Sequence, residues 1–314
     1  MQTKLYMILN HQKTVASVFM RGGCSLSVEL FPACLLFKCG FFFYNRKKPT
    51  EILCRGVFIM KLSVLYTGYL ETDAAGIVAG SSGSIRLPVL CFLIQAPGRN
   101  ILFDTGCHPN AMAGHWSPKI TNSFRLVQRP EERLEQQLAL CGLSPEQIDT
   151  VVLSHMHFDH TGGLYLFPDA EVYAPRADFT AAQVRVRCNP DPFTHGGYCK
   201  ADLDLCSNVY TLVDTDFTLL PGLEVVQLPG HTPGLMGLIV RLAGGTVLLP
   251  QDCVYTAANY GPPVRRTGSA FSWELYHSSI EKLRTLQAQE DALIFFAHDW
   301  ENFQTLKRAP EYYE

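Results

Sequence analysis

The sequence has 314 residues, of which 47% are hydrophobic and 18% charged, and its formal net charge is -3. A chain of this length can bury the core of one large domain or of two smaller ones. The small net charge argues against a nucleic-acid-binding surface spread over the whole chain. The 11 cysteines are scattered and form no CxxC pair, whereas secreted disulfide frameworks are shorter and denser in cysteine. We therefore expect a cytoplasmic protein that binds no nucleic acid.

The first sixty residues differ in composition from the rest of the chain. They contain eight Lys or Arg and two Glu, a net charge of +6, which leaves -9 for the remainder. No strand or helix periodicity persists in them, and the apolar run 35–44, interrupted by Lys38, is too short to span a bilayer. No cleavage pattern of a signal peptide follows this run. We expect residues 1–59 to be a disordered extension or translation from an upstream start, and residues 60–314 to form the functional domain.

The alternative for residues 1–59 is a leader that associates with a membrane, although we expect no stable insertion.

From Met60 onward the chain reads as an ordered domain. Short apolar runs bounded by turn residues predict its strands. In chain order, the predicted strands span residues 62–70, 89–94, 101–103, 151–153, 172–173, 209–213, 223–228, 236–242, 246–249 and 292–296.

Two helices are predicted from capping and periodicity. One spans 131–140, with Gly142 as its C-terminal signal, and the other spans 273–287, with Ser272 as its N-cap. Segment 183–207, rich in Asn, Asp, Pro, Gly and Cys, predicts a long irregular insert of the kind that often forms a lid. Strands in both halves with covering helices indicate an α+β fold, in which two sheets pack face to face with helices outside.

A cluster of three histidines and one aspartate lies at residues 155–160, directly after predicted strand 151–153. His155 and His157 alternate by two, so an extended segment points both side chains the same way. Asp159 and His160 follow where the chain begins to turn, and they can face a second point. Neutral imidazole and carboxylate are ligands that Zn²⁺ prefers. The alternative is a polar loop that happens to be rich in histidine. The two glycines at 162–163 argue against it, because they provide the backbone freedom that a packed metal-binding loop needs.

Three more residues of ligand type follow the ends of predicted strands. These are His231, Asp252 and His298. Taken singly, such a histidine is usually a hydrogen-bonded surface residue, and such an aspartate usually belongs to a turn or a cap. Together with the 155–160 cluster, they provide five His and two Asp. Two zinc ions that share one bridging carboxylate would use this set.

This pattern resembles the signature of the metallo-β-lactamase superfamily. The resemblance implies a four-layer αβ/βα sandwich with a dinuclear site between the sheets. Within the superfamily the chain is similar to the N-acyl-homoserine-lactone lactonases, because Tyr255 lies three residues after Asp252 and segments 296–299 and 310–312 match theirs. The resemblance covers 60–312 but does not extend residue by residue through the insert.

The resemblance also implies roles for these residues. One Zn²⁺ would be held by His155, His157 and His231, and the other by Asp159, His160 and His298, with Asp252 bridging the two. Other divalent metals remain possible. A metal-bridging hydroxide would then open the lactone ring of an N-acyl-homoserine lactone, with Asp159 transferring the proton and Tyr255 stabilising the oxyanion. Asp104 would either orient a ligand imidazole or simply form a turn.

Several alternatives stay open at this point. Glyoxalase II-like thioesterases share all seven ligands, and Tyr255 is the residue that discriminates against them. The dizinc β-lactamases commonly have Cys where this chain has Asp252. A mononuclear iron oxygenase would use only the first set of ligands, and a binding module without chemistry would need no complete set. The substrate class that we expect is therefore a small lactone.

The remaining candidate residues have weaker spacing. A second zinc site in the insert, made from Cys188, His195, Cys199 and Cys206, matches no common zinc module, and we expect plain loop residues instead. We expect the five other histidines to be surface or loop residues; they are His11, His108, His115, His195 and His277.

Overall fold

The protein is described here by a computed structural model that covers residues 6–10, 13–19, 25–30, 60–204, 209–268 and 270–314. The chain divides into two units, Met1–Cys54 and Arg55–Glu314. In the first unit, an antiparallel sheet is formed by β1 (Tyr6–Asn10), β2 (Lys13–Phe19) and β3 (Ser25–Leu30). The sequence predicted no regular element there. The rest of the predicted extension, 31–59, lies outside the described residues.

The first sheet of the second unit has seven strands and is mixed. In spatial order these are β10 (Val209–Val213), β9 (Glu171–Pro175), β8 (Thr150–Val152), β6 (Arg99–Phe103), β5 (Ser84–Ala96), β4 (Lys61–Asp73) and β7 (Arg125–Val127). β6, β8, β9 and β10 pair in parallel, and β4, β5 and β7 pair antiparallel. Because parallel strands end at the same edge, the loops that follow β6 and β8 lie next to each other.

The second sheet has five strands. They are β11 (Phe217–Leu220), β12 (Leu223–Gln227), β13 (Met236–Leu242), β14 (Gly245–Leu249) and β15 (Leu293–Ile294), in this spatial order. The predicted strands 209–213 and 236–242 match β10 and β13 to the residue. β7 and β11 were not predicted, because β7 is only three residues long and β11 is half-exposed with no clear alternation.

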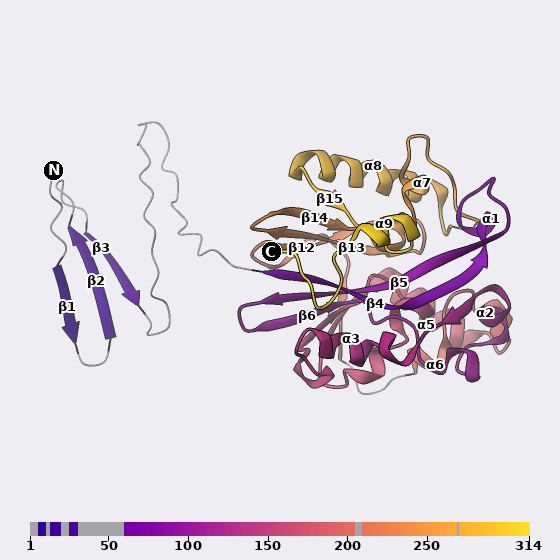
Figure 1. Cartoon of the computed structure of the whole chain (residues 1–314), viewed down its shortest axis with the longest axis horizontal. Helices are drawn as coiled ribbons and strands as arrows, with labels where there is room; N and C mark the ends of the chain where they lie inside the picture. The colour runs from indigo at the N-terminus through magenta and orange to yellow at the C-terminus, as the bar shows by residue number, and fades with distance from the viewer. Residues whose placement is uncertain (1–5, 11–12, 20–24, 31–59, 205–208, 269) are drawn as a thin grey trace. The chain divides into compact units, whose positions relative to one another are not determined.

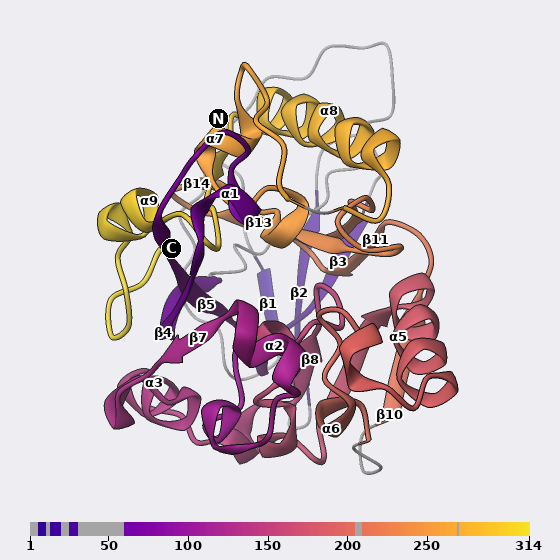
Figure 2. The ribbon, with the colours of Figure 1, turned by 90° about the vertical axis from the view of Figure 1, so that its right-hand side faces the viewer.

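Helices cover the outer face of each sheet. On the first sheet lie α3 (Leu134–Leu140), α5 (Arg176–Cys188) and α6 (Lys200–Leu203), with α2 (Pro118–Ser123) beside them, and on the second lie α7 (Ala257–Tyr260) and α8 (Trp273–Glu290). Figure 2 shows the strands between these two helical layers. Two short helices, α1 (Ala74–Ile77) and α9 (Trp300–Thr305), lie near the sheet margins. None of the helices in the described ranges is long and apolar enough to cross a membrane.

Three apolar clusters separate the four layers. Neighbouring residues of β5 illustrate the arrangement, because Phe92 faces the cluster between the sheets and Leu93 faces the cluster beneath α3 and α5. This alternation follows from the period of two in a strand. A third cluster joins the second sheet to α8 through Ile280 and Leu283. The predicted α+β sandwich of two sheets with helices outside is therefore confirmed.

The predicted irregular insert 183–207 is partly wrong. Residues 183–188 complete the helix α5, and the short helix α6 lies further on. Most polar side chains of α5 face solvent, whereas Asp178 is buried and Ala182 and Val186 pack into the cluster beneath the first sheet. Within the described residues of this segment, the stretch between α5 and α6 contains only a short 3-10 turn, Pro192–Thr194, and part of it packs against the metal-ligand loop described below.

Candidate metal centre

The candidate centre lies where strands of both sheets end. The chain supplies the cluster 155–160 after β8, His231 after β12, Asp252 after β14 and His298 after β15. His157 is the N-cap residue of α4 (Phe158–Thr161), and the helix itself carries Asp159 and His160. The extended segment and the helix thus present side chains to two neighbouring points, as the spacing predicted.

All seven predicted ligands come together. The ligand atoms of each of the following groups lie within 4.8 Å of one another: His155, His157 and His231; Asp159, His160 and His298; and His155, His160 and Asp252. Asp252 lies between the first two groups. Its carboxylate oxygens are 3.5 Å from Nε2 of His231 and 3.0 Å from Nε2 of His298. One carboxylate thus contacts a histidine of each group, which is the position of a bridging ligand.

Four atoms in this centre are buried and make no hydrogen bond of normal geometry to a described residue, even though two of them, Asp252 Oδ1 and His298 Nε2, lie 3.0 Å apart. The four atoms are Nε2 of His155, His160 and His298 and Oδ1 of Asp252. A buried polar atom without a partner costs about 1–3 kcal/mol. Four such atoms at one point are the expected state of a ligand set whose cation supplies the missing interactions. The residues therefore fit a pair of metal ions.

In most of these histidines, a neighbouring residue contacts the ring nitrogen that points away from the centre. Nδ1 of His155 lies 3.0 Å from the Ser154 hydroxyl, and Nδ1 of His298 donates to the Pro88 carbonyl at 2.9 Å. Such contacts fix the tautomer and the orientation of a metal-binding imidazole. They leave Nε2 of both residues free to bind a metal.

Asp104 orients a ligand imidazole, which resolves the alternative left open by the sequence. Its carboxylate accepts from Nδ1 of His160 at 2.7 Å and from the backbone and hydroxyl of Ser154 at 2.6 and 2.7 Å. The side-chain amide of Gln251 donates to the same carboxylate. Asp104 and Gln251 both have positive φ values, 60° and 46°. Strain of this kind is typical of functional sites, where the surrounding contacts impose it.

Burial and charge set the protonation of the histidines. Burial lowers the pKa of His231 to about 4 and, with the neighbouring imidazoles, lowers the pKa of His155 well below its usual value. These rings are therefore neutral, as a metal ligand must be. Burial also acts on His160 and His298, but the carboxylates, Asp252 foremost, outweigh it and raise the pKa of both. The carboxylates near His160 and His298 thus favour a positive charge at this group of ligands.

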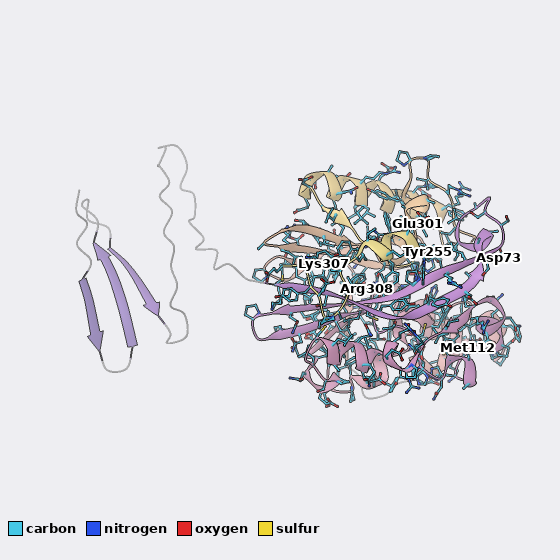
Figure 3. All side chains as sticks on the ribbon, in the orientation of Figure 1. Asp73, Met112, Tyr255, Glu301, Lys307 and Arg308 are labelled. Carbon is cyan, nitrogen blue, oxygen red and sulfur yellow. The ribbon has the colours of Figure 1, made fainter. Side chains whose placement is uncertain are left out.

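Tyr255, labelled in Figure 3, lies between the outer helical layers and contacts one histidine of each ligand group. Its hydroxyl is 3.0 Å from Nδ1 of His231, and its ring contacts those of His231 and His298. Burial, with the charges of Asp252 and Asp159, raises the pKa of the phenol well above its usual value. The phenol therefore stays protonated. If Nε2 of His231 bound a metal, its Nδ1–H would donate to the Tyr255 hydroxyl and leave the phenol proton available.

The structure adds residues that sequence reasoning missed. Asp178, in the first turn of α5, is fully buried and accepts from the backbone of Met156 and the hydroxyl of Tyr198. Nothing near Asp178 in the sequence signals this role, because both donors are distant along the chain. Ser154 was also missed. It is a hydroxyl residue directly before His155, and this position in the sequence could have suggested that it contacts the ligand.

The weaker candidates lie in and near the segment between α5 and α6. His195 is a loop residue, as expected, but it is buried, with Nε2 2.9 Å from the carbonyl of Asn189. Cys199 does not join Cys188 and His195 in a metal group; it lies instead with His115 and Asp202. The 2.5 Å separation of His115 Nε2 and Asp202 Oδ1 is that of a hydrogen bond. Cys206 and His11 lie outside the residues whose side chains the structure describes.

The model of the metallo-beta-lactamase superfamily matches residues 85–298, which include every predicted ligand. The chain belongs to the metallo-β-lactamase superfamily. Both the four layers and the position of the centre at the strand ends agree with this membership.

Several relatives within the superfamily are lactonases. The chain is 33% identical over 276 residues to N-acyl homoserine lactonase AiiB of Agrobacterium fabrum, covering 81% of this chain and 99% of the relative. An N-acyl homoserine lactonase of Bacillus cereus is 32% identical over 240 residues, covering 73% and 88%. A solved N-acyl homoserine lactone hydrolase, with N-hexanoyl-L-homoserine bound at its catalytic metal centre, is 28% identical with a TM-score of 0.72, covering 82% of this chain and 100% of the other.

Proposed function

We propose that this chain is a metal-dependent hydrolase that opens the lactone ring of N-acyl-homoserine lactones, a quorum-quenching activity. The observation that carries the proposal is the convergence of four buried ligand atoms that make no hydrogen bond of normal geometry to a described residue. Two relatives that match most of the chain's length, from Agrobacterium fabrum and Bacillus cereus, are N-acyl homoserine lactonases. The partner would be a small lactone.

Two ions would occupy the centre. One would be held by His155, His157 and His231, the other by Asp159, His160 and His298, and Asp252 would bridge them. Imidazole and carboxylate ligands suit Zn²⁺, and other divalent metals are compatible with the set. When bound, such a pair would lower the pKa of water toward neutrality and would polarise an ester carbonyl.

Asp159 would carry the proton during ring opening. Its side chain is buried, and its oxygens lie 3.7 Å from Nε2 of His160 and of His298. Burial raises the pKa of this carboxyl in the absence of metal, and a carboxylate at this position can relay a proton between the nucleophile and the leaving group. It would accept the proton of the attacking water and deliver it to the ring oxygen that leaves as an alkoxide.

Tyr255 would bind the substrate carbonyl. Because Nδ1–H of His231 donates to its hydroxyl, the phenol proton points away from His231. It can donate to the carbonyl oxygen as negative charge develops there, in the manner of an oxyanion hole. No serine or cysteine nucleophile is required, and Cys253 is a buried packing residue in the cluster beneath α8.

We propose that the protein acts in the cytoplasm. Six cysteines of the described part, among them Cys91, Cys107 and Cys253, are free thiols. Free thiols in this number support a reducing compartment.

Metal analysis and an ester assay test the proposal together. We expect two equivalents of zinc per chain and acid release in a pH-stat from an N-acyl-homoserine lactone, lost after chelation and restored by zinc. The same assay on a simple γ-lactone, a thioester and a β-lactam compares the alternatives. Faster turnover of the thioester than of any lactone would replace the proposed reaction with that of a thioesterase.

A further inference from the structure

One of the five histidines at the centre is held differently from the others. Four have a hydrogen-bond partner on the ring nitrogen that faces away from the metal position. The partners are Ser154 for His155, Asp104 for His160, Tyr255 for His231 and Pro88 for His298. His157 turns its Nδ1 inward, 3.0 Å from Nε2 of His231. In the described part of the chain, its outward Nε2 has no hydrogen-bond partner.

Packing from the segment between α5 and α6 takes the place of that hydrogen bond. Gly197 lies so close to the His157 ring that a Cβ atom at this position would be 2.7 Å from Cδ2 and 2.9 Å from Nε2. The next residue, Tyr198, contacts the same ring with a centroid distance of 5.0 Å. The Gly197 carbonyl accepts from the backbone of Phe158 at 3.0 Å. His157 is therefore confined from outside by two consecutive residues.

Asp178 connects this packing to the ligand loop. One carboxylate oxygen accepts from the Tyr198 hydroxyl at 2.6 Å, and the other accepts from the backbone N–H of Met156 at 2.7 Å. Met156 is the residue between the ligands His155 and His157. A single buried carboxylate thus fixes both the loop that carries His157 and the ring that packs against it.

We propose that Tyr198 and Asp178 are positioning residues that hold His157 in the orientation that binds metal, with Gly197 providing the close approach. The proposal rests on the proposed function, because it assumes that His157 binds the ion shared with His155 and His231. It assigns the segment between α5 and α6 a role at the metal centre. The other ion, whose ligands are held by Asp104 and Pro88, is independent of this contact.

The test compares how readily a chelator removes each of the two zinc ions from the loaded full-length protein. In Tyr198→Phe the hydroxyl is lost, so the ring is no longer tied to Asp178. We expect one of the two zinc ions to be removed by a chelator at a concentration about tenfold lower, in line with the usual effect of a residue that orients a metal ligand. The second ion should be released as in the wild type. Cobalt substitution should show a changed visible spectrum for one of the two ions only.

Tyr210→Phe is the matched control. The ring of Tyr210, in β10, packs on Phe179, which follows Asp178 in α5. The Tyr210 hydroxyl makes no hydrogen bond to a described residue. We expect this variant to release both ions as the wild type does. Asp178→Asn, which keeps the size of the side chain but replaces one acceptor oxygen by a donor, should show the same selective loss as Tyr198→Phe.

Three results are distinguishable. Unchanged release of both ions from Tyr198→Phe would overturn the positioning role. Equal weakening of both ions, with a lower melting temperature of the metal-free variant, would also overturn it, because it would show a general packing defect. A wild-type protein that binds no pair of ions would instead contradict the proposed function itself.

Discussion

At the scale of single residues, the centre depends on which nitrogen of each histidine is free. Asp104 illustrates the principle, because its bond to Nδ1 of His160 leaves Nε2 of that ring unpartnered among the described residues. The Pro88 carbonyl does the same for His298. The ligands alone do not make the site; the residues behind them select the tautomer.

Tyr255→Phe separates binding of the metal from catalysis. The hydroxyl contacts His231 but is not among the seven ligands. We expect the variant to retain two equivalents of zinc and to lose about 10²-fold or more in kcat, because one oxyanion donor is missing. Steady-state kinetics on an N-acyl-homoserine lactone measures this. Full kcat and KM in the variant would show that Tyr255 has no part in the reaction.

Asp252→Ala removes the carboxylate that lies between the two groups. We expect metal and activity to be lost together, because Nε2 of His231 and of His298 would each lose a shared anionic neighbour. The measurement is zinc content after gel filtration together with turnover. Retention of two zinc ions would contradict the bridging role.

The sequence was sufficient to predict that the seven candidate ligands come together, because each follows an apolar strand or lies in one local cluster. It was not sufficient for Asp178 and Tyr198, whose roles depend on contacts 20 or more residues away along the chain. A polar residue of this kind has the same appearance in a sequence as a helix-surface residue. Only the packing of α5 against the ligand loop reveals that the carboxylate is buried.

At the scale of elements, turns at the strand ends bring the ligands within reach of one another. The strands were predictable because they are short apolar runs between turn residues. The helix α5 was not predicted, since its C-terminal half carries Arg185, Arg187 and Cys188 and has a polar composition that resembles a loop. Tertiary packing of Ala182 and Val186 decides for the helix.

Gly230→Ala tests the turn that carries His231. A Cβ atom at this position would lie 2.4 Å from the backbone of Tyr276 in α8, and the φ of 139° is unfavourable for other residues. We expect the variant to be destabilised by more than about 1 kcal/mol and to bind zinc less tightly. Gly76→Ala is the control, since its Cβ would have no neighbour within 4 Å. Equal urea midpoints for the two variants would contradict this account of the turn.

Cys199 reports whether the segment between α5 and α6 is packed as described. Burial, with the charge of Asp202, raises the pKa of its thiol to about 12, whereas Cys188 is exposed. Because the thiolate is the reactive form, iodoacetamide at pH 8 should label Cys188 and spare Cys199. Labelling of Cys199 should rise about tenfold per pH unit toward its pKa. Peptide mass spectrometry that finds equal labelling at pH 8 would show that the segment is not packed there.

At the scale of the whole molecule, the two sheets and their helices form one hydrolase domain. About four-fifths of this chain, 81% or 82%, covers 99% of the Agrobacterium lactonase and all of the solved hydrolase. This supports the proposal that residues 60–314 are the functional domain and that the preceding residues are an addition. The fold class was predictable from the alternation of strands and helices, whereas β1, β2 and β3 lie in a segment without a recognisable period.

The central claim is that seven side chains hold two metal ions at the strand ends. Anomalous diffraction at the zinc edge from crystals of the loaded protein measures this directly. We predict two peaks per chain, about 3.5–4 Å apart, one among His155, His157 and His231, the other among Asp159, His160 and His298. A single peak, or peaks elsewhere in the chain, would contradict it.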